Sequence, residues 1–183
     1  MAFELHVVVA CTPSGGMYVR RGDSTTTTMI EKDVAVIMDR GAWNTTRRDK
    51  VVVSRLGLVV VVCDRFPGLW SDDDLTDAIV VGTIDDAVRV ARHADKTKAY
   101  VVLSGGFGSW SLYAAALARP DCVGVHVTWL ASDSNIDCDG FFPVHSLGSD
   151  AAWVELDAHG SCSDFVRAHC LMPPHRKTLG AGA

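Results

Sequence analysis

The chain has 183 residues, a hydrophobic fraction of 48% and a formal net charge of -5. This length suits a single domain with a sizeable core. The negative charge argues against a general nucleic-acid-binding protein, which presents a clustered basic surface. No apolar run reaches the roughly 20 residues that span a bilayer, so no membrane insertion is expected.

The cysteines and the start of the chain indicate an intracellular protein. The segment "MAFELHVVVAC" enters a strand at once and has the features of neither a signal peptide nor an Arg-rich transit helix. No cysteine pair forms a CxxC motif, and several cysteines lie in apolar runs, where a free thiol behaves as a small hydrophobe. We expect reduced thiols and a location in the cytoplasm or an organelle, the mitochondrion included. The six cysteines are Cys11, Cys63, Cys122, Cys138, Cys162 and Cys170.

Strands are predicted wherever β-branched apolar residues run together. These runs are nearly continuous rather than alternating, which is typical of strands covered on both faces of a parallel sheet. They lie at residues 5–10, 34–38, 51–53, 58–63, 79–81, 99–103 and 123–130.

Two helices are predicted between these strands. In "TIDDAVRVARHA", Thr83 is the expected N-cap and Asp86 takes the third helical position, a variant of the capping box. The second helix, "SWSLYAAALA" at 109–118, begins at a serine and stops before Pro120. The alternation of strands and helices predicts an α/β domain with a largely parallel sheet. The apolar stripe of the first helix comprises Ile84, Ala87, Val88 and Ala91.

Several motifs in the second half of the chain resemble dihydrofolate reductase. They are "VVLSGGFGSWSLYAAAL", "VGVHVTW" and "IDCDGFFP". In that family a strand ends in a Gly-Gly pair, a helix carries a Tyr, a strand holds a Thr, and an acidic turn leads to Phe-Phe-Pro. Here the matching positions are Gly105-Gly106, Tyr113, Thr128 and 139–143.

The first half is similar to the same family through "VAVIMDRGAWNTT" and "RRDKVVVSR". The resemblance implies one domain over residues 1–170, with a mostly parallel central sheet flanked by helices. The acidic, Pro- and Gly-containing segment 63–77 is interpreted as an insertion and 171–183 as a C-terminal tail. We expect either segment to contact a protein partner, through the apolar side chains of Leu69, Trp70, Leu171 and Met172, with Arg176 and Lys177 at the rim.

The resemblance also implies a binding site for NADP(H). Gly105 and Gly106 would let the backbone approach a pyrophosphate. Arg40 matches the Arg that contacts the 2'-phosphate, and Ser54 and Arg55 match a further phosphate-binding pair. An equally simple interpretation makes both arginines solvated surface charges. NADP(H) is therefore a possible cofactor but not a required one.

On the substrate side, Arg48 matches the Arg that binds the folate glutamate carboxylate, and Thr128 matches the Thr that hydrogen-bonds the catalytic acid. That acid has no clear counterpart. Counting back from the "VIM" motif reaches Asp23, in a segment without an apolar helical stripe, and Glu31 lies too close to the strand. We therefore assign no catalytic residue, and we predict that no buried carboxylate lies within hydrogen-bond reach of Thr128.

Two further departures concern the cofactor side. Asp39 replaces a family Gly, where its charge opposes a phosphate. Ala42 replaces a Thr that caps a helix and touches the cofactor, and a lost cap typically costs about 1 kcal/mol.

The hypothesis that follows is a catalytically degenerate dihydrofolate-reductase-like protein that serves as a structural or interaction subunit of a larger assembly. The alternative is an NADPH-dependent reductase of dihydrofolate or a related pterin or pyrimidine. A third possibility is a module that binds a dinucleotide without turning it over.

The remaining residues of interest have simpler explanations. Phe141 and Phe142 are predicted to pack at the edge of the core. His6 and His126 lie inside strands and have no partner at metal or catalytic spacing, so we interpret them as hydrogen-bonded sheet residues without a metal.

Overall fold

The computed structural model describes most of the sheet and its helices. The last two described segments, and residues 109 and 130, are described through their backbone alone. The described residues are 2–12, 15–17, 33–63, 77–102, 109–130, 141–142, 152–155 and 165–171.

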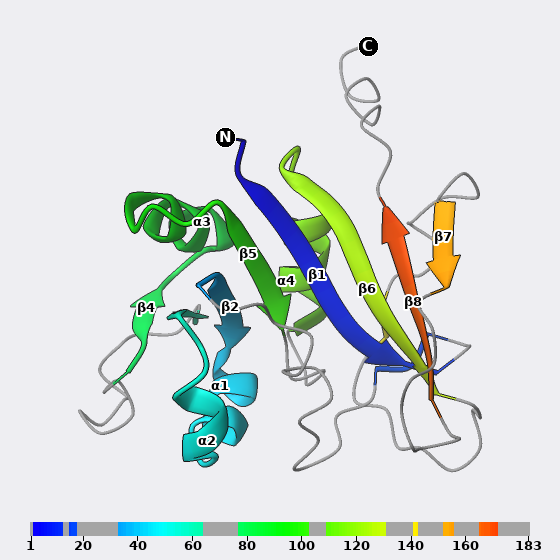
Figure 1. Cartoon of the computed structure of the whole chain (residues 1–183), viewed down its shortest axis with the longest axis horizontal. Coiled ribbons are helices and arrows are strands. Elements are labelled where there is room, and N and C mark those ends of the chain that lie inside the picture. The colour runs from blue at the N-terminus through cyan, green and yellow to red at the C-terminus, as the bar shows by residue number, and fades with distance from the viewer. Residues whose placement is uncertain are drawn as a thin grey trace.

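The described strands form one sheet of eight, in the order β4-β3-β2-β5-β1-β6-β8-β7. Neighbours from β4 to β6 run parallel, whereas β8 is antiparallel to both β6 and β7 (Figure 1). The expected single α/β domain with a mostly parallel sheet is confirmed. In chain order the elements are β1 (Glu4–Cys11), β2 (Ala35–Asp39), α1 (Arg40–Thr46), α2 (Lys50–Val53), β3 (Leu58–Val62), β4 (Ile79–Val81), α3 (Ile84–His93), β5 (Lys98–Val102), α4 (Ser109–Leu117), β6 (Cys122–Leu130), β7 (Ala152–Glu155) and β8 (Phe165–Leu171).

One predicted strand is wrong. The Val-rich segment 51–53 lies in the short helix α2 rather than in the sheet. The Asp49 carboxylate accepts the backbone N–H groups of Val51 and Val52, at 3.0 and 3.1 Å, and so caps this helix. Val51 is 60% exposed. A local cap therefore outweighs the β preference of three valines in this segment.

The sheet has two faces with different coverings. On the first face, Leu5, Val7 and Val9 of β1 pack against residues of α3 and α4. On the second face, Val8 and Met38 pack with Trp43 of α1, and Val53 of α2 lies against them. In the view of Figure 1, α4 passes behind β1 and β5.

The start of α3 agrees with the sequence prediction in detail. Thr83 is the N-cap: its hydroxyl oxygen accepts the Asp86 N–H at 3.1 Å, and the hydroxyl donates to the Asp86 carboxylate at 2.8 Å. The hydrogen bond from Thr83 lowers the pKa of Asp86. The expected stripe is buried on the first face, at Ile84, Ala87, Val88 and Ala91.

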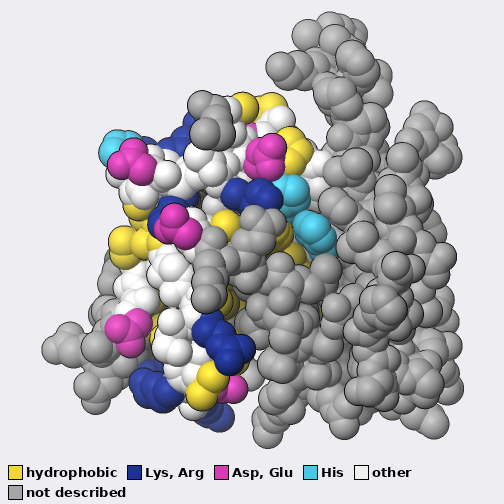
Figure 2. Space-filling model, viewed as in Figure 1, with side chains coloured by type: hydrophobic (Ala, Val, Ile, Leu, Met, Phe, Trp, Pro, Cys, Tyr) yellow, Lys and Arg dark blue, Asp and Glu magenta, His cyan; other side chains and the backbone are white. Residues whose placement is uncertain are grey.

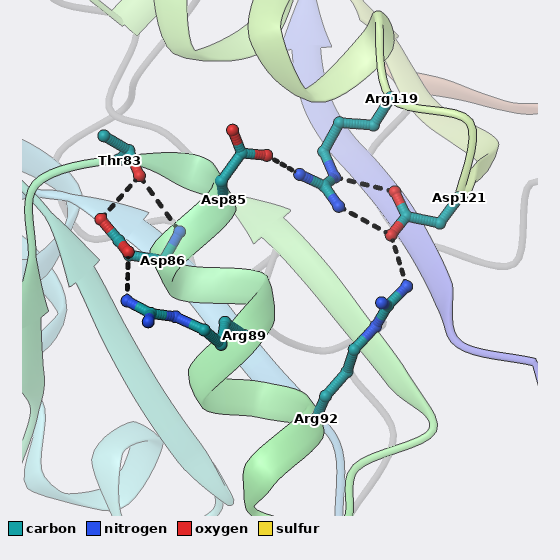
Figure 3. A network of polar contacts seen from close by, with 7 residues as sticks. All are labelled: Thr83, Asp85, Asp86, Arg89, Arg92, Arg119 and Asp121. Atoms are coloured by element: carbon teal, nitrogen blue, oxygen red, sulfur yellow. Dashed lines mark hydrogen bonds and ion pairs between the residues drawn. The ribbon is translucent and has the colours of Figure 1, made fainter.

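An ionic network joins α3 to the turn before β6 (Figure 3). Asp121 accepts two hydrogen bonds from Arg119, at 2.8 and 2.9 Å, and a third from Arg92 at 2.9 Å. Arg119 also bonds to Asp85 in the first turn of α3. The hydrogen bonds that Arg119 donates to Asp121 raise the pKa of the Arg119 guanidinium. The network connects the two ends of α3 to one turn of the chain, since Asp85 and Arg92 lie at opposite ends of the helix.

The second predicted helix is also present. α4 ends at Leu117, three residues before Pro120, and the Tyr113 hydroxyl donates to the Val8 carbonyl at 2.9 Å. Among the described residues, no helix is long and apolar enough to cross a membrane.

Candidate functional site at the carboxyl edge of the sheet

The carboxyl ends of β2, β5, β1 and β6 meet along one edge of the sheet, in that order. In parallel α/β sheets, ligands bind outside these ends. Three described features lie there: the turn after β1, the start of α1 after β2, and the last residues of β6.

The turn after β1 is held by its own backbone. Thr12 N donates to Gly16 O and Gly15 N donates to Thr12 O, each at 2.8 Å. The Thr12 hydroxyl accepts the Gly16 N–H at 3.0 Å. Gly15 has a φ of 90°, which a residue with a side chain rarely adopts. The chain reverses here, and Met17 bridges back to Cys11.

The "FF" pair of the acidic turn attaches to this reversal. Phe142 N donates to Gly15 O at 2.8 Å, and Phe141 forms a β-bridge with Gly16. Phe142 is 3% exposed and meets the Tyr113 ring edge-on, with centroids 5.3 Å apart. Its expected packing role is confirmed, but the same expectation for Phe141 is wrong, because Phe141 is 64% exposed. Successive residues of an extended segment point to opposite sides, so only one of the pair enters the core.

The start of α1 carries an unexpected cap. Asp39, the last residue of β2, accepts the Ala42 N–H through Oδ1 at 2.6 Å. The expected loss of a cap at Ala42 is therefore offset by the carboxylate three residues earlier. Arg40 follows as the first residue of α1 and is half-buried.

Thr128 lies at the other end of this edge. It is 6% exposed and stands on β6 opposite Ala10 of β1 and Arg167 of β8. Two strands, β5 and β1, separate β6 from β2. The strands that carry Thr128 and lead to Arg40 are therefore about 14 Å apart, because neighbouring strands are spaced by about 4.8 Å. A ligand that touched both residues would have to cross the ends of β5 and β1.

Ser54 and Arg55 do not follow a strand, although residues 51–53 were predicted to form one. They follow the helix α2 and precede β3, and the Ser54 hydroxyl donates to the Val51 carbonyl at 2.9 Å. Both are exposed, as is Arg48 in the turn between α1 and α2. Phosphate binding by Ser54 and Arg55, and carboxylate binding by Arg48, stay predictions without a strand end to support them.

Other residues of the expected site lie outside the described part of the chain. These are Gly105 and Gly106 of the cofactor side, and Asp23 and Glu31, the nearest acids to a catalytic position. The expected absence of a carboxylate beside Thr128 therefore stays a prediction. Most of the insertion 63–77 and the tail beyond Leu171 also lie outside the described part of the chain.

Sequence reasoning missed a contact between two histidines. His6 Nδ1 lies 3.3 Å from His126 Nε2, although the two residues are 120 positions apart in the sequence. Because no local spacing connects them, only the register between β1 and β6 could reveal the pair. The described side chains include no group of three His, Cys, Asp or Glu residues arranged to hold a metal ion.

Comparison with known proteins rests on structure alone. No protein-family model matches the sequence, and no curated protein matches it. Among solved structures, the chain is similar to Schistosoma mansoni dihydrofolate reductase, with a TM-score of 0.69 and 17% sequence identity. The match covers 94% of this chain and 100% of that one.

The chain has a dihydrofolate-reductase-like fold. This likeness covers almost the whole chain. At 17% identity it concerns the fold, and function has to be argued from the side chains.

Proposed function

We propose that this chain is a non-catalytic protein of dihydrofolate-reductase-like fold that acts through contacts with other proteins. The observation that carries the proposal is the Asp39 carboxylate, which caps α1 at 2.6 Å from Ala42 N. The resemblance assigns cofactor contact to this helix start and a phosphate to Arg40 beside it. A fixed anion at that point repels a phosphate and takes up the backbone donor of Ala42.

Exposed aromatic side chains support the interaction role. Trp110 is 56% exposed and lies three residues before Tyr113 on α4. Phe141, 64% exposed, directly precedes Phe142. Each exposed aromatic residue thus lies within three residues of a member of the buried contact between Tyr113 and Phe142. Large aromatic residues are the side chains most enriched at the centres of protein interfaces.

A second candidate function is NADPH-dependent reduction of dihydrofolate or a related pterin or pyrimidine. It is favoured by the presence of Thr128, buried at the carboxyl edge, and of Arg40 at the start of α1. Under this reading, Asp23 or Glu31 supplies the acid.

Nucleotide binding and turnover by three forms of the chain separate these functions. We expect the wild-type protein to oxidise no NADPH in the presence of dihydrofolate. Asp39→Asn should bind NADPH at least about fivefold more tightly than wild type, because a unit charge close to a phosphate is worth on the order of 1 kcal/mol even in water. Asparagine caps helices about as well as aspartate, so this variant removes the charge and keeps the helix start.

Asp39→Gly is the matched control that removes both the charge and the side-chain cap. It should bind NADPH no better than Asp39→Asn and should unfold at lower urea concentration. Turnover by the wild-type protein would overturn the proposal in favour of the reductase. Equal NADPH affinity in the wild type and Asp39→Asn would remove Asp39 as its support.

The interaction role is tested with surface variants. Trp110→Ser and Phe141→Ser should each lower recovery of co-purifying proteins from the native source at least fivefold. Val51→Ser, also at an exposed apolar position but on α2, is the matched control and should not. Undiminished recovery with both aromatic variants would contradict an interaction role for these two side chains.

A further inference from the structure

Basic side chains are concentrated in one part of this acidic protein. The chain carries a formal net charge of -5, yet residues 40–55 include five basic residues and a single acid. In Figure 2, basic side chains gather where Figure 1 places α1 and α2. The rest of the chain is therefore more acidic than the whole, and the two parts have opposite signs. The five basic residues are Arg40, Arg47, Arg48, Lys50 and Arg55.

Three of these cations are exposed and are not neutralised by their neighbours. Arg48, Lys50 and Arg55 are all exposed, and within the described part of the chain none of them forms an ion pair. The single acid of the segment is Asp49, whose carboxylate accepts the N–H groups of Val51 and Val52. We call Arg48, Lys50 and Arg55 the α2 surface, because they lie at or beside the two ends of that helix.

The cations of α3 are arranged differently. Arg89 donates to the carboxylate of Asp86 at 2.5 Å, and Arg92 donates to that of Asp121 at 2.9 Å (Figure 3). These two arginines are as exposed to solvent as those of the α2 surface, but each has a carboxylate beside it. The α3 side therefore balances its own charge, whereas the α2 surface keeps a positive field that attracts an anionic partner.

The α2 surface is presented by packed residues. Trp43 of α1 is 2% exposed and belongs to the second-face core. Val53 and Leu56, on either side of Arg55 in the sequence, pack against the same core. A partner that binds here meets a backbone already held in place, so less conformational freedom is lost on binding.

An acidic protein segment suits this surface better than a nucleic acid does. Guanidinium groups bind carboxylates through two parallel N–H···O hydrogen bonds. The net charge of -5 repels a long polyanion, whereas a short acidic segment meets only the local positive field. Proteins that bind single-stranded nucleic acid also stack bases on exposed aromatic rings, and the one aromatic residue of 40–55 is the buried Trp43.

We propose that the α2 surface docks a short acidic segment of a protein partner. This inference rests on the proposed interaction role and names the chemistry of one contact in it. The contact is separate from Trp110, because α4 packs on the first face of the sheet and α2 on the second. Charge complementarity mainly speeds the encounter and selects the partner. The acidic remainder of the chain contributes to this selection by repelling the same segment elsewhere.

Fluorescence anisotropy with two labelled peptides tests the proposal. Both have about ten residues; one alternates Asp with Glu and the other alternates Asn with Gln. At low salt the full-length chain should bind the acidic peptide at least about tenfold more tightly than the neutral one, and added salt should reduce the difference by screening.

Two double variants that remove the same charge locate the binding. Arg48→Gln/Arg55→Gln should weaken binding of the acidic peptide about fivefold, because each exposed ion pair contributes a few-fold at most. Arg89→Gln/Arg92→Gln is the matched control on α3 and should change the affinity less than about twofold. Urea denaturation of each variant verifies that it is folded.

The outcomes separate this inference from the proposed function. Equal affinity of the two double variants for the acidic peptide would overturn the inference, as would equal binding of both peptides by the wild type. Tighter binding of an oligouridine at Arg48 and Arg55 would overturn it in favour of a nucleic acid. Trp110→Ser should leave peptide binding unchanged. NADPH turnover by the wild type contradicts the proposed function, whereas loss of the arginine dependence contradicts this inference alone.

Discussion

The two faces of the sheet are built from the same strands but differ in chemistry. Along β1, Leu5, Val7 and Val9 enter the first-face core, while His6 and Val8 alternate with them on the second face. The first face is closed by the apolar sides of α3 and α4. The second face holds polar groups at buried positions, because His6 and Thr128 are 7% and 6% exposed.

This difference indicates that the two faces of the sheet serve different purposes. Burying a polar group costs free energy unless the group is hydrogen-bonded, so folding alone favours apolar side chains at buried positions. The first face follows that rule closely, whereas the second retains His6, Tyr100, His126 and Thr128. Changes at buried apolar positions should therefore act on stability, whereas changes at the polar positions of the second face should act mainly on binding.

The strongest test of this difference between the faces is to substitute neighbouring residues of β1. Leu5→Ala should lower the free energy of unfolding by about 3 kcal/mol, because it leaves a cavity at a fully buried position. His6→Gln, one residue on and facing the other way, should cost less than about 1 kcal/mol. Urea denaturation of both variants provides the measurement. Equal losses would mean that both faces are packed for stability alone.

A second test uses the thiol of Cys122 on the first face. Burial raises the pKa of this thiol to about 11, from an ordinary value of 9.0. Above about pH 9 the unfolded chain loses this proton while the folded chain keeps it. Stability should therefore fall as the pH rises from about 9 to 11, by at most about 1.4 kcal/mol per pH unit.

The control for this slope is Cys122→Ala, compared with the wild type from pH 8 to 11 by urea denaturation. Tyrosines and lysines titrate in the same range, so the difference between the two slopes is the quantity of interest. A wild-type slope no steeper than that of Cys122→Ala would show that the thiol ionises freely in the folded protein.

The smallest expected effect concerns the ionic network at the turn before β6. Asp121→Asn should cost about 1 to 2 kcal/mol, because Arg119 and Asp121 have side chains only 16% and 10% exposed. Asp86→Asn, whose partner Arg89 is largely exposed, should cost clearly less than Asp121→Asn, because solvent screens an exposed ion pair. Denaturation at low and high salt measures both, and a larger loss for Asp86→Asn would contradict the ranking.

Much of the fold was predictable because its signals are local. The Thr83 cap and the stripe of α3 lie within nine residues of each other and need no knowledge of the rest of the chain. The parallel strands were predictable too, because each is a nearly continuous apolar run that can be recognised locally. α2 was misassigned because Asp49, a single capping residue, outweighs three valines. β7 and β8 were missed because segments such as "FVRAHCL" mix polar and apolar residues, as antiparallel strands often do.

The candidate sites were less predictable because they depend on register. Nothing in the sequence indicates that His6 and His126 are neighbours. From the sequence, Asp39 was expected only to oppose a phosphate, and its role as the cap of α1 was not predicted. The tail boundary is a similar case: β8 includes Leu171, which pairs with Gly124 and Ala152, so a truncation that spares the sheet has to fall after this residue.

The position of β1 in the sheet also constrains how the protein can be made. Glu4 pairs with Lys98 of β5, and Leu5 pairs with Cys122 of β6, so among the described strands β1 gains its two sheet neighbours only after about half of the given sequence has followed. Until then its apolar residues stay exposed to solvent and to other nascent chains. Such non-local pairing slows folding and prolongs the aggregation-prone stage. In the cell, this protein should therefore depend on chaperones that hold β1 during translation.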